Sequence, residues 1–157
     1  MKILRKFLPL LALLAAAQKP ERHPSPSFQA RSIDGESFTK DSLKGKAVLI
    51  QYWATWCGYC RKDEPAVERI VKSFGGKGLV VLAVNIDEPK DKVAKYLSEH
   101  PRSPKIVLSK DTNLGMFHTG SFPTYLLIDQ QGRLASYREG AGGEQSLKEM
   151  VAEAGLK

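Results

Sequence analysis

The chain has 157 residues, of which 42% are hydrophobic and 26% are charged, and its formal net charge is +7. The basic residues are spread along the sequence without a run interleaved with aromatic residues, so the charge does not indicate a nucleic-acid-binding protein. The length suffices for one domain with a sizeable core and not for two. The sequence contains no internal repeat and no low-complexity segment.

Residues 1–17 have the pattern of a secretory signal peptide. Basic residues at positions 2, 5 and 6 precede an apolar run that ends in Ala15-Ala16-Ala17, a small-residue pattern typical of a cleavage site. The run is shorter than the roughly 20 residues that span a membrane. Its removal leaves 157 − 17 = 140 residues with a net charge of 7 − 3 = +4. An uncleaved N-terminal anchor is the alternative.

The leader predicts an exported protein, in the periplasm or on the outer face of the cytoplasmic membrane. Such a compartment is oxidising, so any pair of cysteine thiols that acts there as a reductant needs a dedicated electron donor. Residues 18–27 contain three prolines and are predicted to be a flexible tether. Residues 28–157 are predicted to form the folded domain.

Hydrophobic periodicity predicts alternating strands and helices over this domain. The predicted elements are a hairpin of residues 28–31 and 37–39, buried strands at 47–54 and 79–85, helices at 58–74 and 90–100, a strand at 105–108, a helical turn at 114–118, a hairpin of 124–129 and 133–139, and a helix at 144–154. Parallel units followed by an antiparallel pair predict an α/β sheet with helices on both faces.

Both cysteines of the chain, Cys57 and Cys60, lie where the strand at 47–54 gives way to the helix at 58–74. A helix N-terminus presents unpaired N–H groups and the positive end of the macrodipole, so it favours a thiolate at Cys57. Cys60 is on the same helical face and can attack a mixed disulfide formed at Cys57. The pair therefore predicts redox chemistry.

Three other uses of the two cysteines are alternatives. A purely structural disulfide would close a four-residue loop, worth only about 2 kcal/mol on the chain-entropy model. A closed zinc site needs about four ligands, and the sequence has no second Cys-x-x-Cys to supply them. A copper-binding metallochaperone would use both thiolates with a histidine such as His118 as third ligand.

The run from Val48 to Cys60, Pro65, and the triplet Phe122-Pro123-Thr124 before an apolar strand together resemble the thioredoxin fold. The resemblance covers about residues 28–155 and is greatest to the exported TlpA/ResA-like thiol-disulfide oxidoreductases, often tied to cytochrome c maturation. It implies a central mixed sheet, an N-terminal hairpin and an extra βα insertion. The proline lies 123 − 60 = 63 positions after the second cysteine, which leaves room for that insertion at 90–108.

The resemblance also implies the roles of the site residues. Cys57 is the attacking nucleophile, Cys60 the resolving thiol, and Pro123 a cis-proline whose loop faces the dithiol. A cis bond before Pro123 would aim the Phe122 backbone at the sulfur atoms, where it can pair with a substrate peptide. Trp56 and Tyr59 are expected to contact the same peptide.

The proton acceptor for Cys60 is open. Asp63 matches an acidic position of ResA-like proteins, Glu64 competes with it, and a solvated carboxylate is the alternative for both. Gln51 stands where thioredoxin has a buried acid, so that proton route is absent. Tyr59 replaces the proline of reducing thioredoxins, which places the expected potential between about −270 and −120 mV and leaves the direction of electron flow open.

The expected function is thiol-disulfide exchange with protein substrates, as a reductant in cytochrome c maturation or in periplasmic thiol maintenance. No dissociable cofactor and no metal are expected, the electron donor is expected in the membrane, and the protein is expected to be a monomer. A peroxiredoxin-like peroxide reductase is the alternative within enzymes: Thr55 precedes Cys57 by two residues, but the Cys-x-x-Cys pair and Trp56 do not suit it.

Overall fold

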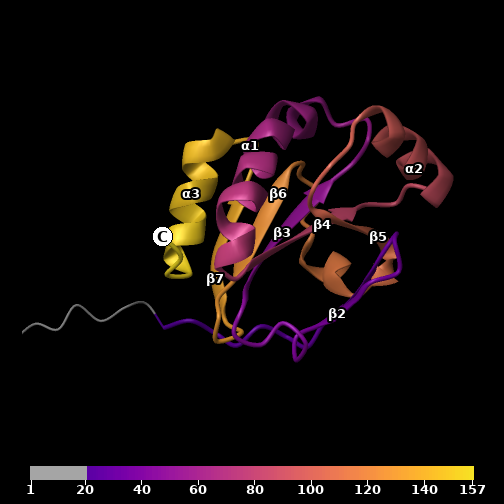
Figure 1. Cartoon of the computed structure of the whole chain (residues 1–157). Helices are drawn as coiled ribbons and strands as arrows, with labels where there is room; N and C mark the ends of the chain where they lie inside the picture. Colours follow the sequence, from indigo (N-terminus) through magenta and orange to yellow (C-terminus); the bar gives the residue numbers. More distant parts are fainter. Residues whose placement is uncertain (1–20) are drawn as a thin grey trace, which may run out of the picture.

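The most apolar segment of the chain, β3 (Ala47–Trp53), is buried along its whole length and lies inside a seven-stranded sheet. The computed structural model describes residues 21–157 of the protein, and Figure 1 shows the helices packed on this sheet. The remaining elements are β1 (Gln29–Ser32), β2 (Ser37–Thr39), α1 (Gly58–Phe74), η1 (Gly75–Lys77), β4 (Leu79–Asn85), α2 (Lys90–Glu99), β5 (Lys105–Thr112), η2 (Leu114–Phe117), β6 (Thr124–Ile128), β7 (Leu134–Glu139) and α3 (Gly143–Glu153).

The sheet has the strand order β2-β1-β5-β4-β3-β6-β7 and is mixed. Strands β3, β4 and β5 are parallel, because helices α1 and α2 carry the chain back between them. Strands β6 and β7 continue the sheet beyond β3 as an antiparallel pair. The dithiol and residues 86–89 therefore follow the carboxyl ends of two neighbouring parallel strands, β3 and β4, at one edge of the sheet.

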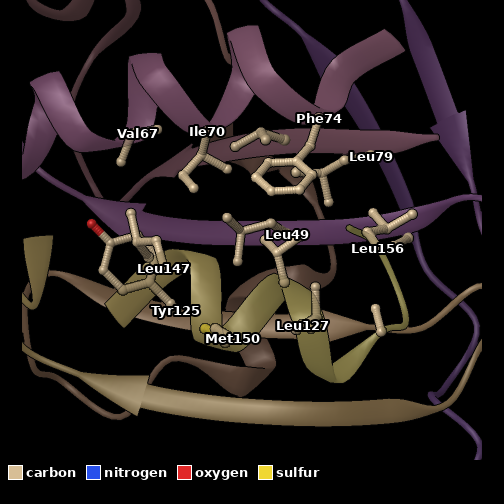
Figure 2. Packing of buried hydrophobic residues seen from close by; sticks show 14 of the residues in the cluster. Leu49, Val67, Ile70, Phe74, Leu79, Tyr125, Leu127, Leu147, Met150 and Leu156 are labelled. Atoms are coloured by element: carbon tan, nitrogen blue, oxygen red, sulfur yellow. The ribbon is translucent and has the colours of Figure 1, made fainter. Parts of the chain in front are cut away.

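Alternate residues of β3 point to opposite faces of the sheet and pack against different elements. Leu49 faces α1 and α3, and Figure 2 shows it between Ile70 of α1 and Leu147 of α3. Residues 48, 50 and 52 face the other side, where they pack with the N-terminal hairpin and η2. Val93 of α2 belongs to a third cluster with Trp53, Cys57 and Cys60.

Helices cover both faces, as expected, but unequally. All three α-helices lie on the face of Leu49 and Trp53, and the short 3-10 helix η2 lies on the opposite face. The reason is that the crossovers β3-α1-β4 and β4-α2-β5 step across the sheet in the same direction, so right-handed connections place both helices on one face. The extra βα insertion consists of α2 and β5.

Residues 22–25 of the predicted flexible tether are instead attached to the domain. Pro24 forms an antiparallel bridge with Arg133, and Ser25 N–H donates to the carbonyl of Gly132 over 2.9 Å. Arg22 pairs with Asp129 over 3.2 Å. The predicted leader, residues 1–17, and residues 18–20 of the tether lie outside the described residues. Between residues 21 and 157, no helix is long and apolar enough to cross a membrane.

Candidate active site

Cys57 is the N-cap of α1 and is joined to Cys60 by a disulfide bond. The Cys60 N–H donates to Cys57 Sγ over 3.0 Å, so a helix-terminal N–H group that lacks an intrahelical acceptor points at this sulfur. Cys57 is 4% exposed, whereas Cys60 is fully buried. Of the two sulfur atoms, that of Cys57 is therefore the one which a partner can approach.

The loop that delivers Cys57 is held by the carboxylate of Glu88. Its Oε2 accepts from Thr55 N–H (2.7 Å) and Asn85 Nδ2 (2.8 Å), and its Oε1 accepts from Thr55 Oγ1 (2.6 Å) and pairs with Lys92 Nζ (2.7 Å). Burial opposes a charge on Glu88, but these donors outweigh it and lower its pKa to about 2. The loop is thus fixed by a group that stays ionised.

Several aromatic side chains lie next to the cysteines in the chain or, like Phe122, pack against the cluster that contains them. Trp56 is 63% exposed and Tyr59 is 70% exposed, on either side of Cys57 in the sequence. The ring of Phe122 meets Trp56 edge to face at 5.4 Å, and His118 packs on Phe122 at 4.6 Å. The peptide bond between Phe122 and Pro123 is cis, as expected. The exposed Trp56 and Tyr59, with the partly buried Phe122, form an aromatic surface, a flat apolar contact for a peptide.

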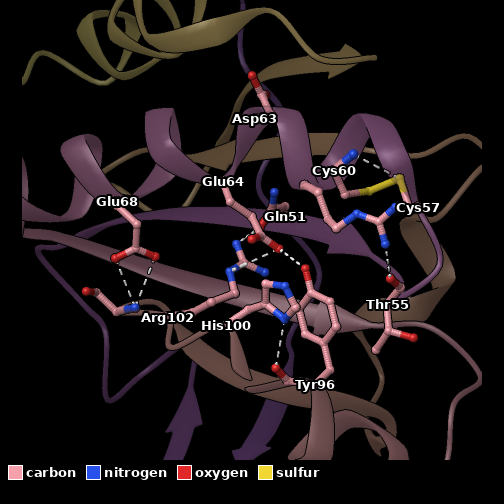
Figure 3. A network of polar contacts seen from close by, with 12 residues as sticks. Gln51, Thr55, Cys57, Cys60, Asp63, Glu64, Glu68, Tyr96, His100 and Arg102 are labelled. Atoms are coloured by element: carbon pink, nitrogen blue, oxygen red, sulfur yellow. Dashed lines mark hydrogen bonds and ion pairs between the residues drawn. A yellow bond between two sulfur atoms is a disulfide. The ribbon is translucent and has the colours of Figure 1, made fainter. Parts of the chain in front are cut away.

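Asp63 is buried, and its two oxygens are bound on the side away from the dithiol. Oδ2 accepts from the hydroxyl of Tyr125 over 2.6 Å, and Oδ1 accepts from Gly143 N–H, at the start of α3, over 2.8 Å. In Figure 3 the carboxylate points away from the Cys57–Cys60 pair. Burial, together with the nearby Asp63, raises the pKa of Tyr125. Asp63 thus joins α1 to β6 and α3.

Glu64 leaves α1 on the other side from Asp63 (Figure 3). It accepts from the Tyr96 hydroxyl over 2.8 Å, and its Oε1 lies 3.8 Å from Nε of Arg102. Burial and this hydrogen bond raise the pKa of Tyr96 to about 12. Gln51, at the position of thioredoxin's buried acid, accepts from Arg102 Nη2 over 2.6 Å.

The predicted site residues are brought together only in part. Those of the dithiol and its aromatic surface lie at one end of the sheet: Cys57, Cys60, Trp56, Tyr59, Phe122 and Pro123. Asp63 and Glu64 are one turn further along α1 and engage other partners. Over residues 21–157, no group of three or more His, Cys, Asp or Glu residues is placed to hold a metal ion, including around His118.

Sequence reasoning missed Glu88 and Arg102. A signal for Glu88 exists: it follows the carboxyl end of β4, the parallel neighbour of β3, and such ends meet at one edge of a sheet. Arg102 has no such signal, because it is one charged residue in a connecting segment and only the tertiary fold buries it.

The AhpC/TSA family model matches residues 22–137. Among curated proteins, thiol-disulfide oxidoreductase ResA of Bacillus cereus is 28% identical over 127 residues, which cover 80% of this chain and 72% of that protein. The thioredoxin-like protein YneN of Bacillus subtilis is 27% identical over 134 residues, which cover 83% of this chain and 78% of YneN.

Two solved structures show the same fold. A thiol:disulfide interchange protein of the thioredoxin family from Chlorobium tepidum superposes with a TM-score of 0.73 at 24% identity, over 87% of this chain and 99% of that one. StoA from Bacillus subtilis superposes with a TM-score of 0.68 at 21% identity, over 83% of this chain and 99% of StoA. The seven-stranded mixed sheet is therefore a thioredoxin fold.

Proposed function

The chain belongs to the AhpC/TSA family and is a thioredoxin-fold thiol-disulfide oxidoreductase of the TlpA/ResA-like type, and from this premise we propose that it reduces disulfides in exported proteins. The observation that carries the proposal is the placement of Cys57. It begins α1, adjoins the exposed Trp56, and is bonded to the fully buried Cys60. Cytochrome c maturation and general periplasmic thiol maintenance are the two settings we propose for this activity.

In the proposed reaction the thiolate of Cys57 attacks one sulfur of a substrate disulfide. A Cys57–substrate disulfide forms, and the other substrate sulfur leaves as a thiolate that takes up a proton. Cys60 then loses its proton and attacks Cys57 Sγ, which releases the second substrate thiolate and closes the Cys57–Cys60 bond. Two electrons pass to the substrate, so a thiol donor, proposed to lie in the membrane, must reduce the protein again.

The surrounding residues have distinct proposed roles. Trp56, Tyr59 and Phe122 provide the apolar surface for the substrate peptide, and the loop at Pro123 presents its backbone to that peptide. Asp63 is the proposed proton acceptor for Cys60, with Glu64 or water as competitors. Both of its oxygens accept hydrogen bonds, from Tyr125 and Gly143, on the side away from the dithiol, so the proton of Cys60 would have to reach it by way of another group.

The test uses reduced full-length protein and a peptide with one intramolecular disulfide. Cys60→Ser is expected to stop at a covalent complex through Cys57, and Cys57→Ser, the matched control, to form none. Mass spectrometry of the non-reduced product reads out both. If Cys60→Ser forms no covalent complex and wild type does not reduce the peptide disulfide, the proposal is overturned. The same variant expressed in cells should then capture the physiological substrate.

Peroxide reduction can be separated from disulfide exchange with the same material. The Thr55 hydroxyl donates its proton to Glu88 and therefore does not donate it towards Cys57. This contact supports disulfide exchange over peroxide reduction. We expect the peptide disulfide to oxidise the reduced protein far faster than hydrogen peroxide does. The reverse order of rates would favour the peroxide reductase.

The proposed location is outside the cytoplasm, with a leader removed between Ala17 and Gln18. Mass spectrometry of material recovered from an exporting host is expected to find a chain that begins near Gln18. A full-length chain that sediments with membranes would instead support the anchored form.

A further inference from the structure

Arg102 carries a positive charge into the interior, where its guanidinium lies against the ring of Trp53. Its side chain is 1% exposed, and its Nη2 donates to Gln51 Oε1 over 2.6 Å. Figure 3 shows the guanidinium among Gln51, Glu64 and Tyr96. Burial lowers the pKa of Arg102, but a guanidinium remains protonated at neutral pH because its ordinary pKa is above about 12. The charge is therefore permanent.

The protein neutralises this charge incompletely. Nε and Nη1 of Arg102 have no hydrogen-bond partner within residues 21–157, and the Gln51 amide that receives Nη2 is neutral. The nearest carboxylate, Glu64, is 3.8 Å from Nε, too far for a hydrogen bond, and is shared with the Tyr96 hydroxyl. A buried charge with unsatisfied donors strongly favours any anion that forms nearby.

The dithiol is the nearby group that becomes anionic during the reaction. The guanidinium carbon of Arg102 lies 4.8 Å from the centroid of the Trp53 ring. Trp53 belongs to the same buried cluster as Cys57 and Cys60. Arg102 thus contacts the buried cluster that contains the dithiol, in an interior where charges interact more strongly than in water.

We propose that Arg102 is a positioning residue which raises the reduction potential of the Cys57–Cys60 pair by stabilising its reduced form, and that Glu64 opposes it. The proposal rests on the proposed function, since it concerns the same dithiol. The other charged or titratable groups that face Arg102 are Glu68 of α1, Tyr96 of α2 and Tyr125 of β6. Of these, Glu68 is engaged by the backbone N–H of Ser103.

The experiment measures the equilibrium of the dithiol with glutathione. Oxidised glutathione takes two electrons and two protons from the protein, which gives two glutathione molecules and the Cys57–Cys60 disulfide. Arg102→Met is expected to favour the protein disulfide about tenfold, a fall in potential of about 30 mV. Glu64→Gln is expected to shift the equilibrium in the opposite direction. Arg102→Lys, which keeps the charge, is expected to remain close to wild type.

Two further measurements separate an electrostatic role from a merely structural one. Arg69→Met removes an exposed arginine from α1, the helix that carries Glu64, and is the control, with no expected shift. The pH dependence of Cys57 alkylation in the reduced protein should move to higher pH in Arg102→Met and to lower pH in Glu64→Gln. Loss of packing alone would not produce opposite shifts in two variants.

Equal potentials for wild type, Arg102→Met and Glu64→Gln would overturn the proposal. If Arg102→Met does not fold, Gln51→Glu serves instead, because a carboxylate at this position would neutralise Arg102 in place and is expected to lower the potential as well. An unchanged potential in a folded Gln51→Glu would also overturn it. A wild-type protein that does not exchange with glutathione or with the peptide disulfide would instead refute the proposed function.

Discussion

Glu88 stabilises the folded state through its charge. Its pKa of about 2 in the folded protein is below the value of about 4.3 expected in an unfolded chain. Because the pKa of Glu88 is lower in the folded protein, the folded state binds the proton less readily than the unfolded chain does. Its contribution to stability is therefore complete above about pH 4.3 and is lost as the pH falls towards 2.

This linkage predicts the behaviour of Glu88→Gln. At pH 7 the variant should have a free energy of unfolding lower by about 1 to 3 kcal/mol, because the donors of Thr55 and Lys92 lose a charged acceptor. The difference from wild type should shrink between about pH 4.5 and pH 2.5, since only wild type loses charge there. Denaturant titrations at several pH values measure it, and a difference independent of pH would contradict the assignment.

The two thiols of the reduced protein should differ in reactivity. Cys57 is partly accessible and begins a helix, whereas Cys60 is fully buried. We expect a short pulse of iodoacetamide to label Cys57 first and to do so at a lower pH than an ordinary cysteine requires. Peptide mapping by mass spectrometry reads out the labelled position. Equal labelling of both thiols at every pH would refute the assignment of Cys57 as nucleophile.

At the scale of elements, Asp63 connects three of them through one carboxylate. It accepts from the Tyr125 hydroxyl in β6 and from Gly143 N–H at the start of α3. A carboxylate near the N-terminus of a helix is also favoured by the helix dipole. Asp63 therefore holds α3 against α1, independently of any role in proton transfer.

Two variants separate these roles. Asp63→Asn and Tyr125→Phe should each lower the free energy of unfolding by about 1 to 3 kcal/mol, because both remove a buried hydrogen bond. If Asp63 accepts the proton of Cys60, only Asp63→Asn should slow release of the mixed disulfide more than its formation. Stopped-flow measurements with a single-cysteine peptide time the two steps. Equal release rates in both variants would leave Asp63 with its structural role alone.

Helix α1 could be predicted from the sequence to the residue, whereas β5 could not. The apolar spacing of α1 and the glycine that follows it are local signals, and the helix ends at Phe74 as predicted. β5 was expected to end at Leu108 but continues to Thr112, because Thr112 pairs with Ala30 of β1. That pairing joins residues 82 positions apart (112 − 30), so no local pattern carries it.

The same distinction holds in the candidate site. The cysteines, Trp56 and Tyr59 lie in one short segment whose chemistry is visible in the sequence, whereas the cis-proline could be predicted only from the resemblance to the thioredoxin fold. The partners of Asp63 and Arg102 come from other elements, so their hydrogen bonds could not be predicted. Two consecutive acidic residues on one helix turned out to face different partners, Tyr125 and Arg102, because α1 presents them to opposite sides.

At the scale of the whole molecule, the chain enters the domain at the turn between β6 and β7. Asp129 is the anchor: its carboxylate accepts from Arg22 and Arg133 and from the backbone of the turn. Burial opposes a charge there, but these donors lower the pKa of Asp129. The backbone bonds of Ser25 and Leu134 to the opposite segment complete the attachment.

Arg22→Ala should loosen this attachment without reaching the dithiol. We expect faster hydrogen exchange at the amides of Ser25 and Leu134, because the arginine no longer joins Asp129 to the carbonyl of Glu153. The glutathione equilibrium should be unchanged. Exchange rates identical to wild type would show that the backbone bridge alone holds the segment.

The entry point and the dithiol lie at opposite ends of β3. Ile128, just before the entry turn, pairs with Val48 at the start of β3, and Cys57 follows its end. Seven residues of strand extend about 23 Å. A copy that is attached to a surface through the residues before Glu21 would thus stand with its reactive sulfur on the far side from that attachment. Partners that project outward from the surface would be within its reach, so the proposed membrane donor would have to present its thiols on a part that extends away from the membrane.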